Sequence, residues 1–111
     1  MAELYRFNER HGTSGTTFFD RRELGQLLSL YSRRVASGEW RDYAIDQGRG
    51  SVTFSIFRNS LDSPLFSIAK RILARGSGEE YVVYSGRRQL ARAESLSEAI
   101  SVLEKKPHVV S

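Results

Sequence analysis

The stretch Phe19 to Asp46, FDRRELGQLLSLYSRRVASGEWRDYAID, constrains the fold more than any other part of the chain. Asp20 and Glu23 have the Asp-x-x-Glu spacing of a capping box, in which each side chain accepts a hydrogen bond from the other residue's backbone N–H. The apolar residues Leu24, Leu27, Leu28, Tyr31 and Val35 follow at steps of three and four. This spacing predicts an amphipathic helix that buries one stripe.

The sequence also predicts where this helix ends. Gly38 stands where a left-handed C-terminal cap is wanted, and Arg33 and Arg34 occupy the last turns, where cations complement the helix dipole. If Leu28 lies in the centre of the buried stripe, its replacement by alanine should cost on the order of 2–5 kcal/mol.

After Gly38 the apolar period changes from 3.6 residues to 2, which indicates strands. Five strands are expected, separated by short glycine-rich or polar turns, and a second helix is expected to begin at a Ser-x-x-Glu box formed by Ser95 and Glu98. The expected strands are residues 40–46, 51–58, 65–74, 80–84 and 87–93. Short turns between successive strands favour antiparallel pairing.

The sequence therefore predicts an α+β domain of two layers, an antiparallel meander of about five strands with an N-terminal and a C-terminal helix on one face. The expected organisation is a flexible segment over residues 1–17, a single domain over 18–106 and a tail over 107–111. Three apolar residues, Phe57, Leu65 and Leu73, are expected on the face of the sheet away from the helices. Their position favours a homodimer through that face.

Composition bounds the chemistry. The chain has 111 residues, a net charge of +4 and no cysteine, so disulfides and thiolate metal sites are excluded. No apolar run is long enough to span a bilayer, and the N-terminus lacks an apolar signal region, so we expect a cytoplasmic protein without a membrane segment. Arginine supplies 14 of the 17 basic residues, as counted along the sequence. Arginine suits phosphate-bearing partners, although a surface of interspersed ion pairs explains the same composition.

No residue pattern typical of an enzyme stands out. Both histidines lie in the terminal segments, and the glycine-rich turns join strands, whereas a phosphate-binding loop opens a helix. Asp42 and Asp46 share one face of a strand and are expected to act as ion-pair partners more often than as a cation site. The sequence predicts no cofactor, no metal and no catalytic residues.

Basic side chains form three clusters that are candidates for phosphate contacts. The first cluster contains Arg22, Gln26 and Arg33 on the exposed face of the first helix. The second contains Lys70, Arg71 and Arg75. The third contains Arg87, Arg88 and Arg92 near the last hairpin. The helix stripe holds no acid, so its arginines are expected to face solvent without partners. Convergence of two clusters on one face would favour nucleic-acid binding.

A second candidate surface is the run Trp40, Arg41, Asp42 and Tyr43. Two aromatic rings interleaved with opposite charges are suited to stacking on a planar ligand or on a partner. The competing and favoured interpretation is that Trp40 and Tyr43 pack the end of the helix against the sheet.

The order helix, strands, helix is similar to that of double-stranded RNA-binding domains. That fold has a lysine-rich start to its second helix, whereas the run at residues 94–98 of this chain reads Glu-Ser-Leu-Ser-Glu. This difference argues against the analogy.

A closer resemblance lies in residues 19–24, 30–31 and 38–46, with further likeness in residues 54–58 and 64–68. These segments resemble a bacterial family, mostly alphaproteobacterial, classed as domain of unknown function number 2794. The resemblance implies a cytoplasmic bacterial protein and implies no activity, cofactor or site. The sequence thus favours a small non-catalytic interaction module that binds a protein partner or itself. Nucleic-acid binding through the arginine clusters is the alternative, and an enzyme with an unrecognised site is the third.

Overall fold

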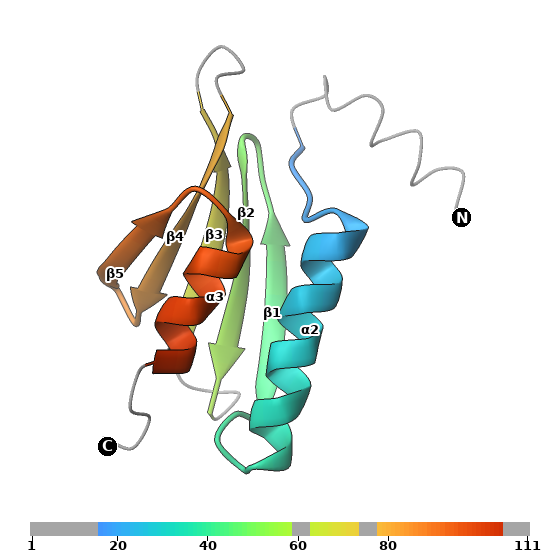
Figure 1. The fold of residues 1–111 in the computed structure, drawn as a ribbon, viewed down its shortest axis with the longest axis vertical. Helices are drawn as coiled ribbons and strands as arrows, with labels where there is room; N and C mark the ends of the chain where they lie inside the picture. Colours follow the sequence, from blue (N-terminus) through green and yellow to red (C-terminus); the bar gives the residue numbers. More distant parts are fainter. Residues whose placement is uncertain (1–15, 59–62, 74–77, 106–111) are drawn as a thin grey trace.

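The computed structural model describes residues 16–58, 63–73 and 78–105. These residues form α2 (Arg21–Ala36), β1 (Asp42–Gln47), β2 (Ser51–Phe57), β3 (Phe66–Ile72), β4 (Glu79–Ser85), β5 (Arg88–Ala93) and α3 (Leu96–Lys105). The strands make one antiparallel sheet in the order β1-β2-β3-β4-β5. Both helices lie on the same side of this sheet (Figure 1). The two-layer α+β prediction is confirmed.

The caps of α2 form as the sequence indicates. The Asp20 carboxylate accepts from the backbone N–H of Glu23 at 2.8 Å, and the Glu23 carboxylate accepts from the backbone N–H of Asp20 at 2.9 Å. Gly38 has a φ of 82°, a left-handed conformation that glycine adopts without steric cost. The chain then turns into β1.

The buried line of α2 is rotated from the predicted one. Leu27 and Leu30 are fully buried and Glu23 is buried beside them, whereas Leu28 is half-buried and Val35 is 40% exposed. The apolar stripe read from the sequence was therefore wrong at its edge. Apolar spacing locates a wide band on a helix. The neighbouring elements decide which residues in that band are covered.

The core lies between the helices and the sheet. Alternate residues of the central strands point toward the helices and meet side chains from α2 and α3. The buried residues of this layer include Leu27, Leu30, Val52, Phe54, Ile56, Ile68, Val83, Ala99 and Leu103. Every second strand residue must then point to the opposite face of the sheet.

The described residues that precede α2 are tied to the turn between β1 and β2. Thr16 pairs with Arg49 in an isolated antiparallel bridge, and the backbone N–H of Thr17 donates to the carbonyl of Gly48 at 3.0 Å. Thr17 is only 9% exposed, so this short stretch is held against the sheet. Residues 1–15 of the predicted N-terminal segment and the predicted tail over 107–111 lie outside the described residues, as does Arg75.

Candidate functional site

A buried polar network connects the start of α2 to the centre of the sheet. The Lys70 ammonium on β3 lies 2.7 Å from Glu23 Oε1 and donates to the carbonyl of Phe18 at 3.0 Å. The Tyr81 hydroxyl on β4 donates to Glu23 Oε2 and lies 3.2 Å from Glu79 Oε1. The Lys70 and Glu23 side chains are 7% and 12% exposed. Lys70 was grouped with Arg71 and Arg75 as a candidate for phosphate contacts, but its ammonium is buried and paired with Glu23.

This network holds charge and protons in fixed positions. Burial raises the pKa of the Tyr81 hydroxyl, and its hydrogen bond to the Glu23 carboxylate and the charge of that group raise it further. Tyr81 therefore remains a donor to Glu23. A pocket of about 270 Å³ opens beside the network, lined by Thr16, Thr17, Phe18, Phe19, Asp20, Lys70 and Ile72. The Lys70 ammonium at this pocket is already held by Glu23 and by Phe18.

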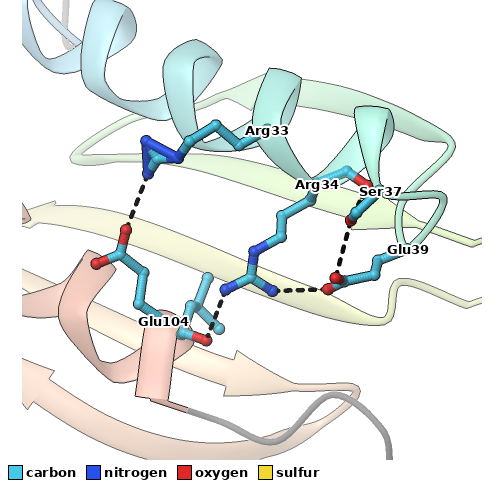
Figure 2. Close-up of polar contacts among 6 residues, drawn as sticks. Arg33, Arg34, Ser37, Glu39 and Glu104 are labelled. Atoms are coloured by element: carbon cyan, nitrogen blue, oxygen red, sulfur yellow. Dashed lines mark hydrogen bonds and ion pairs between the residues drawn. The ribbon is translucent and has the colours of Figure 1, made fainter.

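The helix stripe of Arg22, Gln26 and Arg33 has a neighbour that its own sequence does not contain. Arg33 forms an ion pair with Glu104 of α3, with 2.9 Å between Nη2 and Oε2 (Figure 2). The expectation that this stripe faces solvent without acidic partners is therefore wrong for Arg33. The acid comes from a helix 71 residues further along the chain. Gln26, Ser29 and Arg33 line a shallow pocket of about 300 Å³ with Ser97, Ile100 and Glu104.

Arg34 is a structural residue that the sequence reasoning missed. Its guanidinium pairs with Glu39 at 2.9 Å (Figure 2) and donates to the carbonyl of Leu103 at 3.5 Å. It also lies 5.3 Å from the centre of the Trp40 ring. Glu39 also accepts from the Ser37 hydroxyl at 2.8 Å. Arg34 thus joins the end of α2, the turn after it and the end of α3. Glu39 and Trp40 follow Arg34 closely in the sequence, and this combination of an arginine with an acid and an aromatic ring could have indicated the contact.

The run Trp40 to Tyr43 is used for packing. Trp40 is 3% exposed, lies beneath Arg34 and contacts the Phe66 ring, so its indole is not available to stack on a ligand. Tyr43 is 38% exposed and packs edge-on against Tyr31 and stacked on Phe54. Burial raises the pKa of the Tyr31 hydroxyl, which donates to the carbonyl of Arg41 at 2.9 Å.

The remaining basic residues divide between different parts of the surface. Arg71 and Arg92 point to the face of the sheet away from the helices, because their cross-strand partners Glu80 and Val82 do so. Both approach Glu80, at 3.1 Å and 3.8 Å. Arg87 and Arg88 are exposed at the turn between β4 and β5, and Arg22 is exposed on α2. The second and third clusters share a face through Arg71 and Arg92, while Arg22 and Arg33 lie in the helix layer.

The family of the chain follows from a model match over residues 17–100, described as protein of unknown function (DUF2794). The chain belongs to this family. No curated protein matches it, and neither does any solved structure. In this DUF2794 domain the matched range begins at the segment held by Lys70 and ends within α3. All five strands lie inside it, and Glu104 lies outside it.

The second face of the DUF2794 sheet, here called the open face, carries no helix or strand among the described residues (Figure 1). Its middle is made of short side chains that are nonetheless screened from water: Ser55, Ser67, Ala69 and Val82 are 6%, 7%, 7% and 0% exposed. Larger side chains surround them, namely Asp42, Asp46, Phe57, Arg71, Tyr84 and Arg92. Leu65 packs against the core instead, which corrects its predicted place on this face.

Two further observations concern the described part of the chain. Neither of its helices is long and apolar enough to cross a bilayer. Within residues 16–58, 63–73 and 78–105, no three histidine, cysteine or carboxylate side chains gather as a metal site would require.

Proposed function

We propose that this DUF2794 domain is a non-catalytic interaction module that binds a protein through the open face of its sheet. The observation that carries the proposal is the chemistry of that face. Uncharged residues fill its middle, two aromatic side chains, Phe57 and Tyr84, stand beside them, and charged residues lie toward the edges. Protein interfaces have this anatomy, with an uncharged centre, enrichment in aromatic residues and arginine, and a polar rim.

The pairing of the buried ionisable side chains with one another supports the non-catalytic part of the proposal. Glu23 and Lys70 neutralise each other under the start of α2, and the Tyr81 hydroxyl retains its proton against Glu23. A general base needs a carboxylate or amine that can reach a substrate and change its protonation state. Each of these groups is instead committed to another part of the fold.

Site-specific photo-crosslinking in the native cell tests the proposal. A photoreactive phenylalanine analogue replaces Tyr84 on the open face, and the matched control places it at Ser32, an exposed residue of α2. We expect protein adducts from position 84 and none from position 32. The proposal fails if position 84 gives no protein adduct, or if both positions give adducts in equal yield.

Nucleic-acid binding is the second proposal, and one observation favours it. Arg22, Arg87 and Arg88 are exposed and form no ion pair within the described residues. It is ranked second because Arg33 is paired with Glu104, and because Arg92 lies on the face opposite Arg22, near Glu80. A phosphate backbone would have to contact two sides of the sheet to use the full set.

A further inference from the structure

Charge is distributed unevenly across the open face. The register places five residues in one straight row across all five strands: Asp46, Thr53, Ala69, Val82 and Arg92. An acid therefore ends the row on β1 and a base ends it on β5. Neighbouring strands lie about 4.8 Å apart, so these ends are separated by roughly 19 Å.

Neither end of this row is fully neutralised within the described residues. Arg71 and Arg92 share the single carboxylate of Glu80, and Arg92 is the more distant of the two at 3.8 Å. A separation of 3.8 Å exceeds a hydrogen bond, and the Arg92 side chain is 58% exposed. Asp46 is exposed and has no ion pair in the described part of the chain. One positive and one negative charge thus remain at opposite edges.

The neighbouring row is uneven in size. It contains Ala44, Ser55, Ser67, Tyr84 and Gln89, so small side chains occupy β1 to β3 and large ones occupy β4 and β5. Layers pack well when large residues on one surface meet small residues on the other. The two rows consequently share one polarity, small and acidic toward β1, large and basic toward β5.

A twofold axis parallel to the strands and passing over β3 places the acidic, small side chains of one copy opposite the basic, large side chains of the other. Such an axis keeps each residue at its height along the strands and exchanges β1 with β5. Asp46 of one copy then faces the partner's Arg92, and Ser55 faces the partner's Tyr84, each contact occurring twice. The alternative twofold axis lies in the plane of the interface and runs perpendicular to the strands. It stacks β1 on the partner's β1 and brings Asp46 toward the partner's Asp42, which is repulsive.

We propose that the occupant of the open face is a second copy of this chain, docked about the twofold axis that runs parallel to the strands. This inference rests on the proposed function and names its partner. The two sheets would pack nearly aligned, as sheets commonly do. Strands of six or seven residues rise about 3.3 Å per residue, so the face measures roughly 19 Å by 20 Å. That is roughly 800 Å² buried in total, below a standard interface, and it predicts a weak dimer.

Sedimentation equilibrium of the full chain between about 5 and 500 µM tests the inference, with charge reversals at the two ends of the row. We expect a reversible wild-type dimer that weakens at high salt, because its end contacts are ionic and solvent-exposed. Asp46→Arg and Arg92→Asp, each alone, should raise Kd at least about tenfold, because each places like charges opposite one another twice. Arg22→Asp, the same charge change in the helix layer, should leave Kd unchanged. Circular dichroism verifies that each variant is folded.

Mixing the two single variants is the sharpest measurement. The Asp46→Arg chain carries two bases at its row ends and the Arg92→Asp chain carries two acids, so an equimolar mixture should form a heterodimer with Kd within about threefold of wild type. Tighter association of Asp46→Arg alone would indicate the perpendicular axis and overturn the inference. A wild-type monomer at 500 µM would also overturn it. In that case a Tyr84 adduct with another protein would leave the proposed function standing, while the absence of any adduct would remove both.

Discussion

Removal of the Lys70 charge is the perturbation that most directly tests how this fold is held together. Lys70 compensates the Glu23 carboxylate, and the two side chains are 7% and 12% exposed. Lys70→Met keeps most of the aliphatic volume and leaves Glu23 buried with only the Tyr81 hydroxyl and the Asp20 N–H as donors. Breaking a buried ion pair in this way costs about 3–5 kcal/mol.

The effect should be large relative to the total stability. The free energy of unfolding of a domain of this size is about 5–15 kcal/mol. With a urea dependence of about 1–3 kcal/mol/M, a loss of 4 kcal/mol shifts the unfolding midpoint by about 2 M. Trp40 is the single tryptophan and is buried, so its fluorescence reports unfolding of the core directly.

A double-mutant cycle distinguishes the ion pair from simple loss of packing. Glu23→Gln keeps an oxygen that can accept from the Asp20 N–H, because glutamine also serves in a capping box. In the Lys70→Met background this change removes the uncompensated charge, so the double variant should be more stable than Lys70→Met alone. If instead the two single losses add within about 0.5 kcal/mol, the residues are not coupled and the reasoning is refuted.

Three more predictions follow from the same structure. Leu27→Ala should lower the free energy of unfolding in urea by about 2–5 kcal/mol because Leu27 is fully buried. Leu28→Ala should cost less because Leu28 is half-buried. The reverse order would contradict the observed burial of α2. The raised pKa of Tyr81 means that the folded chain retains a proton that the unfolded chain loses near pH 10. The contribution of Tyr81 to stability should therefore be constant below about pH 10 and should fall above it. Tyr81→Phe should flatten this alkaline loss, and an unchanged pH profile would show that Tyr81 is not its source. In titrations against duplex RNA and duplex DNA at two salt concentrations, the Arg22→Glu and Arg88→Glu variants should bind no more weakly than wild type if the sheet-face proposal is right; a salt-dependent affinity that both changes reduce would favour nucleic-acid binding instead.

Local patterns in the sequence were sufficient for the elements and their order. Asp20, Glu23 and Gly38 act through backbone groups a few residues away, so the limits of α2 follow from spacing alone. The alternation of apolar residues in the strands, with short turns between them, likewise determined an antiparallel meander. These signals depend on neighbours in sequence, which is why they could be read without the fold.

The candidate sites depended on contacts between distant parts of the chain, and there the tertiary structure decided. Arg33 was predicted to lack an acidic partner, but α3 places Glu104 beside it. Lys70 was grouped with other basic residues as a candidate for phosphate contacts, but β3 places it under Glu23. The sequence around a charged residue does not reveal its ion-pair partner when that partner lies on another helix or strand. The row from Asp46 to Arg92 is likewise set by strand register, which the alternation of apolar residues within each strand does not fix. The sequence by itself determined a two-layer domain, and only the packed sheet decided which of the described charges pair with one another.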